Sequence, residues 1–183
     1  MARFNFLKTA LTDYKVGAVA KSSKYVVRRV LKRIKGPLDL IVEYGPGEGV
    51  MTRALLSKLS PAGRLVAVET NIEFAKMIGA MPDPRVTVIH GTAEQAGSTL
   101  KNLPKVDLII SSIPFSFLPP AQRERIVSDA GDFLVPGGTL IIFHQYSLLM
   151  LTTVKKYFKD TSALFEPRNF PPCFIIVARK TID

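Results

Sequence analysis

Most of the chain alternates between two hydrophobic patterns. Short apolar runs of six to eight residues, typical of buried strands, are separated by stretches in which apolar residues recur at helical spacing. This alternation predicts an α/β fold with a mostly parallel sheet and helices on both faces. Right-handed crossovers bring the carboxyl ends of such strands to one rim, where ligands bind in open α/β sheets. The predicted strands span residues 38–43, 64–69, 85–90, 106–112 and 138–145, and the predicted helices between them span 48–59, 71–80, 93–101 and 120–134.

The last part of the chain predicts one more helix and two more strands. Apolar spacing favours a helix over residues 147–158, followed by strands at 161–165 and 173–179. The segment 168–172, with the sequence RNFPP, separates these strands because proline cannot continue a strand ladder. We therefore expect a seven-stranded sheet that ends in a hairpin-like pair.

Two amphipathic helices are predicted ahead of the sheet. In the first, Arg3–Tyr14, apolar side chains recur at helical spacing. In the second, Ser22 or Ser23 can cap a helix whose apolar stripe runs from Val26 to Ile34, and Gly36-Pro37 stops it. We expect the second stripe to pack on the sheet.

Composition narrows the possible chemistry. A chain of 183 residues, 47% of them hydrophobic, predicts one domain with a substantial core. The single cysteine, Cys173, excludes an internal disulfide, and the only histidines are His90 and His144, so no dedicated metal site is expected. No segment has the roughly 20 apolar residues that a membrane span needs. We expect a metal-free monomer in the cytoplasm.

The net charge of +10 is concentrated at the N-terminus. Residues 1–36 hold ten Lys and Arg side chains against one acid, Asp13, whereas residues 37–183 are almost neutral. The charge therefore does not indicate a general nucleic-acid-binding surface. We divide the chain into a basic helical extension, residues 1–36, that would act as a membrane or lid element, and a main domain, residues 37–183.

The strongest chemical signal is a glycine-rich turn after the first strand. Residues 38–49 read LDLIVEYGPGEG, and such a turn lets a nucleotide-like ligand approach the backbone closely. The dinucleotide fingerprint would need a glycine where Val50 stands, which weakens an NAD interpretation. A second apolar run ends at Glu69, 22 residues past Gly47, where a carboxylate can accept hydrogen bonds from ribose hydroxyls. Either motif alone also fits an ordinary turn between a strand and a helix.

The segment Glu43–Gly49 resembles motif I, E/D-x-G-x-G-x-G, of class I S-adenosylmethionine-dependent methyltransferases. The resemblance implies a Rossmann-like fold, S-adenosylmethionine as cofactor and S-adenosylhomocysteine as product. In that family the glycine turn packs on the amino-acid part of the cofactor. Thr92 and Ala93 match the segment beside the adenine, although Thr92 can equally be a plain helix cap. The predicted cofactor-binding residues are Glu43, Tyr44, Gly45, Gly47, Glu69, Thr70, Thr92, Ala93 and Ser111.

The loop after the fourth predicted strand bears on the methyl acceptor. It reads SSIPFSF from Ser111, and Ser112 stands where methyltransferases acting on nucleic-acid bases carry an asparagine or aspartate. A hydroxyl is a poorer partner for an exocyclic amine than an amide carbonyl, which disfavours a base as acceptor. Phe115 and Phe117 fit a base-stacking role or a core role equally well.

The acceptor amine must lose a proton before it can attack. An ammonium group with a pKa of about 10 is mostly protonated at neutral pH, so a nearby group or a desolvated pocket must release its proton. The candidates for a catalytic role are Tyr146, His144 and Ser112, and a chain of waters is an equal alternative. No residue is an obvious general base from sequence alone.

Taken together, segments such as EYGPGEGVMTRALL, SSIPFSFLPP and RNFPPCFIIVARK resemble the bacterial phospholipid N-methyltransferases. That group methylates the amine of phosphatidylethanolamine and is similar in sequence to ribosomal RNA adenine dimethyltransferases. Ser112 departs from the small residue, such as glycine, that is usual there. The alternatives are an RNA adenine N6-methyltransferase, a methyltransferase of another small amine or lipid, and a noncatalytic cofactor-binding protein.

A phospholipid substrate implies contact with a membrane. A basic amphipathic helix at the N-terminus suits an anionic surface, because its apolar side chains enter the headgroup boundary while its cations bind lipid headgroups. We therefore predict peripheral binding to the inner face of the cytoplasmic membrane. The same helix packed on the sheet with solvated charges is the alternative. The predicted membrane-binding residues are Arg3, Phe4, Phe6, Leu7 and Lys8.

Overall fold

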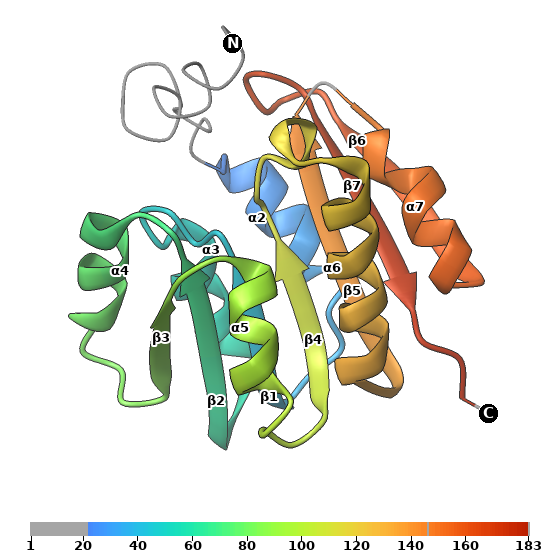
Figure 1. The fold of residues 1–183 in the computed structure, drawn as a ribbon. Coiled ribbons are helices and arrows are strands. Elements are labelled where there is room, and N and C mark those ends of the chain that lie inside the picture. The colour runs from blue at the N-terminus through green and yellow to red at the C-terminus, as the bar shows by residue number, and fades with distance from the viewer. Residues whose placement is uncertain (1–21, 146, 183) are drawn as a thin grey trace, which may run out of the picture.

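The computed structural model describes residues 22–145 and 147–182, and its centre is a seven-stranded sheet (Figure 1). The strand order is β3-β2-β1-β4-β5-β7-β6, and β7 is the one strand of this sheet that runs opposite to the other six. The α/β class, the mostly parallel sheet and the terminal hairpin are thereby confirmed. The strands are β1 (Leu38–Tyr44), β2 (Leu59–Glu69), β3 (Val86–His90), β4 (Val106–Ser111), β5 (Leu134–Gln145), β6 (Asp160–Glu166) and β7 (Cys173–Arg179).

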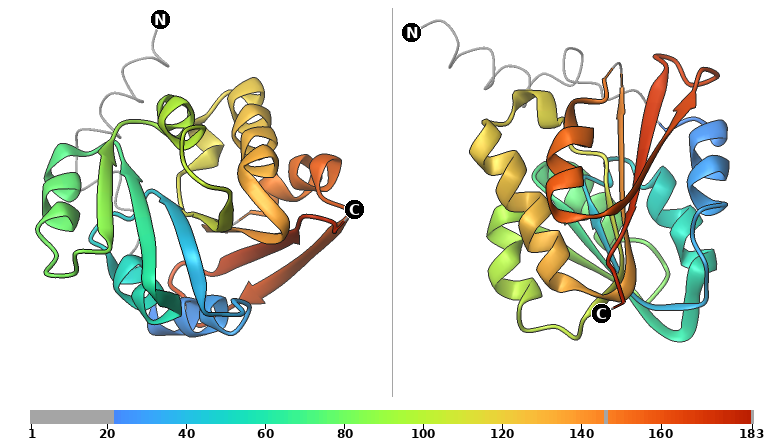
Figure 2. Two further views of the ribbon diagram at one scale, coloured as in Figure 1. Left: turned by 90° about the horizontal axis from the view of Figure 1, so that it is seen from below. Right: turned by 90° about the vertical axis from the view of Figure 1, so that its right-hand side faces the viewer.

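Helices cover both faces of the sheet, and an apolar core lies under each layer (Figure 2). The helices α2, α3 and α4 pack on one face, and α5, α6 and α7 pack on the other. The central strands are buried on both faces, which explains their continuous apolar sequences. The helices are α2 (Lys24–Leu31), α3 (Val50–Leu55), α4 (Ile72–Gly79), α5 (Ala93–Leu100), α6 (Pro120–Phe133) and α7 (Leu149–Tyr157), with 3₁₀ turns η1 (Leu56–Lys58) and η2 (Phe115–Phe117).

Helix α2 packs on the sheet as its apolar stripe predicts. The Ser23 side chain caps it by accepting a hydrogen bond from the Val26 backbone N–H, and Val26, Val30 and Ile34 are buried. The helix ends at Leu31, before the predicted stop. The first predicted helix and its five membrane-binding residues lie outside the described residues, and the division of the chain at residue 36 stays a prediction.

Two strands begin earlier than the sequence predicts. Leu59 pairs with Leu38, and Leu134 pairs with Val106, directly after the preceding helical turns. Each strand then shifts register through a segment rich in proline and glycine before regular pairing resumes. Proline and glycine make these segments look like loops in the sequence. Only the pairing of the first residue of each strand with a distant strand shows that the strand has already begun.

The strand order reverses between β1 and β4. In a doubly wound sheet this is the point where ligands bind, beyond the carboxyl ends of the strands. The ends of β1, β2, β4 and β5 carry the predicted site residues at this rim. Among the described residues, no helix has the length and apolar character needed to cross a bilayer.

Candidate active site

The glycine turn leaves β1 with three residues in left-handed conformations. Gly45, Gly47 and Gly49 have φ angles of 73°, 54° and 75°. A Cβ on Gly45 would lie 2.9 Å from Ile113 Cγ2, and one on Gly49 would lie 2.5 Å from Ile78 Cδ1. A Cβ on Gly47 would meet no atom within 4 Å. Gly45 and Gly49 are therefore needed for internal packing, whereas Gly47 borders open space in which a ligand can approach the backbone.

Glu69 fixes the glycine turn to the end of β2. Its Oε2 accepts a hydrogen bond from the Gly47 backbone N–H at 3.0 Å, and its Oε1 accepts one from the Asn71 backbone N–H at 2.9 Å. Thr70 lies beside it, with its hydroxyl 3.4 Å from Oε1. The carboxylate is almost fully buried and its orientation is set before any ligand binds. Asn71, which also caps α4, was not singled out from sequence, although an asparagine between a strand and a helix is a common capping signal.

Glu43 is a second buried carboxyl group, on the face of the sheet that α3 covers. It is 2% exposed, and its Oε2 has no hydrogen-bond partner of good geometry among the described residues. Burial raises the pKa of Glu43 to about 7; the nearby Thr52 hydroxyl opposes this shift and the Glu69 carboxylate adds to it. The group is thus poised to ionise when a cation approaches it.

Two adjacent serines end β4 with different roles. The Ser111 hydroxyl is buried and has no hydrogen-bond partner among the described residues. The Ser112 hydroxyl donates to the Gly45 carbonyl at 2.6 Å, and its backbone N–H donates to the Tyr44 carbonyl at 3.0 Å. Ser112 therefore connects the loop after β4 to the glycine turn. Its predicted role at the acceptor amine stays a prediction, and only the oxygen lone pairs of this hydroxyl remain available for it.

Three of the predicted cofactor residues also have clear structural roles. The Tyr44 side chain is buried in the core beneath the helices α5 to α7, and burial raises its pKa. Thr92 is the N-cap of α5, where its hydroxyl accepts from the Gln95 backbone N–H and its own N–H donates to the Gln95 side chain. Ala93 packs against the same core. Their contacts with a cofactor stay predictions.

His144 lies one strand away from the serines, near the end of β5. Burial lowers its pKa below the ordinary value of 6.5; the Gln145 backbone partly offsets this effect and the Arg123 cation reinforces it. Its Nδ1 is buried with no hydrogen-bond partner of good geometry among the described residues. His144 is therefore neutral at pH 7 and able to accept a proton. The other candidate on this loop, Tyr146, lies outside the described residues.

Arg123 organises the loop that faces His144. From α6, its guanidinium donates to the Leu118 carbonyl at 2.8 Å and to the Ser116 carbonyl at 3.3 Å. Within this loop Phe115 is fully buried in the core, whereas Phe117 is 47% exposed. Nothing in the local sequence marks Arg123, because its two bonds depend on how the chain turns between β4 and α6.

The rim thus divides into two halves. The half over β1 and β2 holds Glu43, the open Gly47 backbone and the fixed Glu69 carboxylate, and the half over β4 and β5 holds the serines and His144. The free space at Gly47 and the unpartnered oxygens of Glu43 and Ser111 fit a polar ligand with a cationic group and a ribose. The second half offers a neutral proton acceptor beside that ligand.

Comparison of the sequence with known proteins shows which family the chain resembles. Residues 41–138, over half of the chain, match the Methyltransferase domain family. The chain is 22% identical over 162 residues to an ornithine lipid N-methyltransferase of Singulisphaera acidiphila, covering 86% of this chain and 84% of that one.

Two further proteins are similar to this chain. The first is similar over part of the sequence, and the second is similar in fold. A ribosomal RNA small subunit methyltransferase A of Phenylobacterium zucineum is 30% identical over 83 residues, which cover 44% of this chain and 28% of that one. The fold is similar to an O-methyltransferase from Bacillus cereus in complex with SAH, with a TM-score of 0.70, 16% identity and coverage of 98% and 91%.

Proposed function

The chain belongs to the methyltransferase domain family and uses S-adenosylmethionine as its cofactor, and we propose that it methylates the amine of a membrane lipid. Phosphatidylethanolamine and its methylated derivatives are the first candidates. The observation that carries this proposal is the similarity to an ornithine lipid N-methyltransferase over 86% of the chain. Both lipid classes present an amine in a headgroup, so one acceptor chemistry would serve either.

The half of the rim over β1 and β2 would bind the cofactor. Glu43 would hold the amino group, the Gly47 backbone would contact the amino-acid part, and Glu69 would accept from the ribose hydroxyls. When bound there, S-adenosylmethionine supplies an electrophilic methyl carbon on a sulfonium sulfur. Since displacement at this carbon needs alignment rather than an added charge, the fixed rim contributes mainly by positioning the reactants.

The other half of the rim would prepare the amine. An ammonium that enters beside β4 and β5 would give its proton to the neutral His144, which leaves the nitrogen lone pair free to attack the methyl carbon. The carbon–sulfur bond would break as the N–C bond forms, and S-adenosylhomocysteine would leave with the electron pair on its sulfur. Loss of water around the bound amine would also favour its neutral form, because burial disfavours the charged form. Ser111 offers a hydroxyl oxygen as a further acceptor for the amine's N–H groups.

An RNA adenine N6-methyltransferase is the second candidate, favoured by the similarity to the ribosomal RNA enzyme over 83 residues. Two features of the chain weigh against it. Ser112 replaces the asparagine that base methyltransferases use, and its hydroxyl proton is engaged by the Gly45 carbonyl. The matched part of the chain also covers only 28% of the RNA enzyme.

The proposed partner is the anionic inner face of the cytoplasmic membrane. The N-terminal 36 residues carry ten cations and one acid, and each Lys or Arg near an anionic surface contributes about 1 kcal/mol. We expect the segment with Arg3 and Phe4 to contribute to this binding.

A direct assay separates the two candidates. The full chain is incubated with methyl-labelled S-adenosylmethionine and either vesicles of phosphatidylglycerol with phosphatidylethanolamine or ribosomal RNA. We expect label in the lipid and none in the RNA. Label in the RNA alone would overturn the lipid proposal. A parallel reaction with ornithine lipid in place of phosphatidylethanolamine measures how strictly the headgroup is selected.

We predict that cofactor affinity rises with pH as Glu43 ionises. Below its pKa of about 7 the carboxyl group is protonated and offers no charge to the cofactor's ammonium, whereas above this pH it does. One charged hydrogen bond contributes about 1.5 kcal/mol, so the affinity should rise about tenfold from low to high pH. Calorimetric titration with S-adenosylmethionine between pH 5.5 and 8.5 measures this rise.

Two variants test this assignment. Glu43→Gln should bind with the same weak affinity throughout the range, because an amide cannot ionise. Asp39→Asn, at the opposite end of the same strand, should keep the wild-type profile, since Asp39 contacts Ser60 far from the rim. An unchanged profile in Glu43→Gln would show that another group titrates.

A further inference from the structure

The tip of the β6–β7 hairpin carries an aromatic side chain that the fold leaves in solvent. Phe170 is 91% exposed, in a loop where the neighbouring Asn169 is only 3% exposed. Leaving a phenylalanine exposed forgoes the free energy that burial of its apolar surface would give. An isolated exposed apolar residue is common on protein surfaces, so its position and its support decide whether it has a role.

The tip lies at the same rim as the proposed active site. β7 begins at Cys173, which pairs with Gln145 at the carboxyl end of β5, and the next pair is Phe174 with His144. The loop that joins β6 to β7 therefore extends beyond the strand that carries the proposed proton acceptor (Figure 1). Other apolar side chains project from the loops after β4 and β5 at this rim, namely Phe117, Leu148 and Leu149, which are 36% to 47% exposed.

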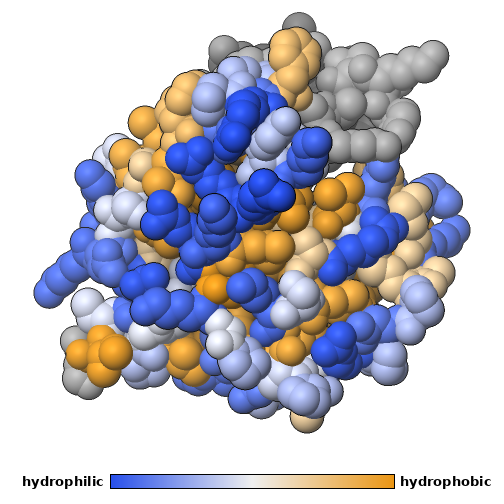
Figure 3. All heavy atoms as spheres, turned by 180° about the vertical axis from the view of Figure 1, so that it is seen from behind, coloured by the Kyte–Doolittle hydropathy of each residue, from blue (hydrophilic) through white to orange (hydrophobic). Residues whose placement is uncertain are grey.

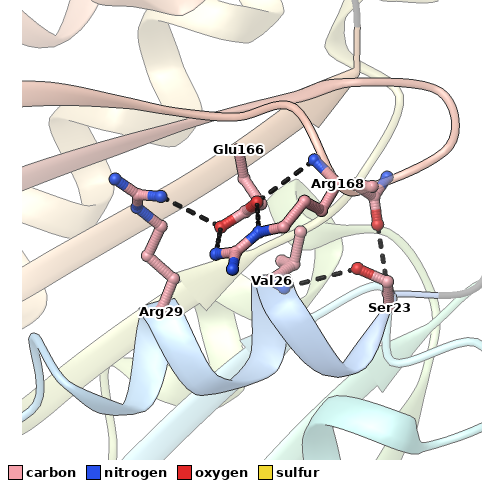
Figure 4. A network of polar contacts seen from close by, with 6 residues as sticks. Ser23, Val26, Arg29, Glu166 and Arg168 are labelled. Atoms are coloured by element: carbon pink, nitrogen blue, oxygen red, sulfur yellow. Dashed lines mark hydrogen bonds and ion pairs between the residues drawn. The ribbon is translucent and has the colours of Figure 1, made fainter.

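A buried carboxylate holds the hairpin tip against α2 (Figure 4). The Glu166 side chain is fully buried, and Arg29 from α2 donates to its Oε2 at 2.9 Å. Arg168 contacts both carboxylate oxygens through its guanidinium, at 2.8 and 2.9 Å, and its backbone N–H also donates to Oε1. These bonds hold the pKa of Glu166 at about 2. The network stays charged across the physiological range and fixes the loop that bears Phe170.

Two further contacts join the same loop to the start of α2. The Arg168 guanidinium lies 4.6 Å from the centre of the Tyr25 ring, and the Asn169 side chain accepts from the Ser23 backbone N–H at 3.1 Å. The hairpin tip therefore lies beside the start of α2, where the described part of the chain begins.

Three cations lie at the hairpin loop that carries the exposed aromatic side chain. Arg168 belongs to the loop, Arg29 bonds to Glu166 beneath it, and Lys24 lies 5.4 Å from the centre of the Tyr25 ring that Arg168 also contacts. Figure 3 shows the hydrophilic band that α2 forms across its face of the molecule. In the hairpin loop Arg168 is 60% exposed, whereas the acid Glu166 is buried. An apolar tip among cations is the pattern that binds an anionic bilayer interface.

We propose that the β6–β7 hairpin tip is a membrane-insertion element in which Phe170 enters the interface of an anionic bilayer and the Arg29–Glu166–Arg168 network holds it beside the active site. This inference rests on the proposed lipid substrate and names a second membrane contact besides the N-terminal segment. It places the mouth of the active site against the headgroups, so that a lipid amine reaches the rim without leaving the bilayer.

The full chain lacks tryptophan, so Phe170→Trp provides a single fluorescent reporter at the tip. On titration with vesicles of phosphatidylglycerol and phosphatidylcholine, we expect its emission to shift to shorter wavelength and brominated lipids to quench it. The matched control is Ile182→Trp, which is also highly exposed but lies near Gly137 at the opposite end of the sheet. Its emission should not change. Equal responses at both positions, or none at position 170, would overturn the proposal.

A binding measurement complements the reporter. Phe170→Ala should lower partitioning onto the same vesicles about tenfold, with unchanged S-adenosylmethionine affinity and melting temperature, because the side chain packs little in the fold. Undiminished binding would contradict the proposal, as would a fluorescence response of the Phe170→Trp variant to ribosomal RNA but not to vesicles.

These vesicles contain no amine-bearing lipid, so binding is measured apart from methyl transfer. Insertion of the reporter at position 170 without methylation of amine lipids would refute the proposed substrate alone. Methylation with that reporter still in solvent would refute the hairpin alone.

Discussion

Replacing Glu69 by alanine is expected to weaken binding of S-adenosylmethionine about 100-fold. The carboxylate holds the Gly47 and Asn71 backbone N–H groups at 3.0 and 2.9 Å, and it would also accept from the ribose hydroxyls. Two hydrogen bonds to a charged group contribute about 1.5 kcal/mol each, and together they correspond to roughly two orders of magnitude in the dissociation constant. Calorimetry with the purified variant measures the loss.

The control for this prediction is Glu73→Ala. Glu73 is four residues further along and exposed, and its side chain pairs with Lys76 on the surface of α4. Its removal takes away the same charge but no contact with the glycine turn, so the affinity should stay within about twofold of the wild type. Glu69→Gln keeps one acceptor oxygen and should fall between the two. A near-normal affinity in a folded Glu69→Ala protein would contradict the proposed ribose site.

Local sequence was enough to predict that the glycine turn and Glu69 lie together at one rim. The glycine turn follows a strand directly, and Glu69 ends the next strand along the chain, so both residues act within a few positions of a recognisable element. In a parallel sheet, consecutive strand ends meet at one rim, and this rule converts two local patterns into one site. The structure places Gly47 and Glu69 in direct hydrogen-bond contact, as that rule leads one to expect.

The acceptor half depends on contacts that sequence spacing does not reveal. Ser112 bonds to Gly45 across 67 residues, and Arg29 bonds to Glu166 across 137 residues. Arg123 bonds to carbonyls only five and seven residues before it, but its electrostatic effect on His144 relates two elements that are separate in the sequence. The early starts of β2 and β5 were missed for the same reason, since each begins with a pair to a distant strand.

The proposed role of His144 as proton acceptor can be tested directly by mutation. Replacing His144 by glutamine should lower kcat for a lipid amine about 100-fold while S-adenosylmethionine affinity stays unchanged. The loss of a positioned general base costs roughly 10²- to 10⁴-fold in typical enzymes, and the lower figure applies because water can partly replace it. A decrease in cofactor affinity equal to the decrease in kcat would instead indicate a structural role for His144.

The pH dependence gives a sharper criterion than the rate alone. The pKa of His144 lies below 6.5, because burial and the Arg123 cation disfavour the imidazolium form. The neutral, active form is therefore present above that pKa, and kcat of the wild type should decline only as pH falls below 6.5. In His144→Gln this acid limb should vanish. The rate should then climb with pH as the lipid amine, with a pKa of about 10, deprotonates by itself.

A change at Arg123 can shift the pKa of His144 without removing its imidazole. Arg123→Gln takes away the cation that faces His144, so the pKa of the imidazole should rise and the acid limb of kcat should move to higher pH. Arg123→Lys keeps a positive charge but loses the planar group that bonds to the Leu118 and Ser116 carbonyls. If the limb moves in the glutamine variant and stays in the lysine variant, the charge acts on His144 directly. A limb that moves equally in both would show that loop geometry, rather than charge, controls the proton transfer.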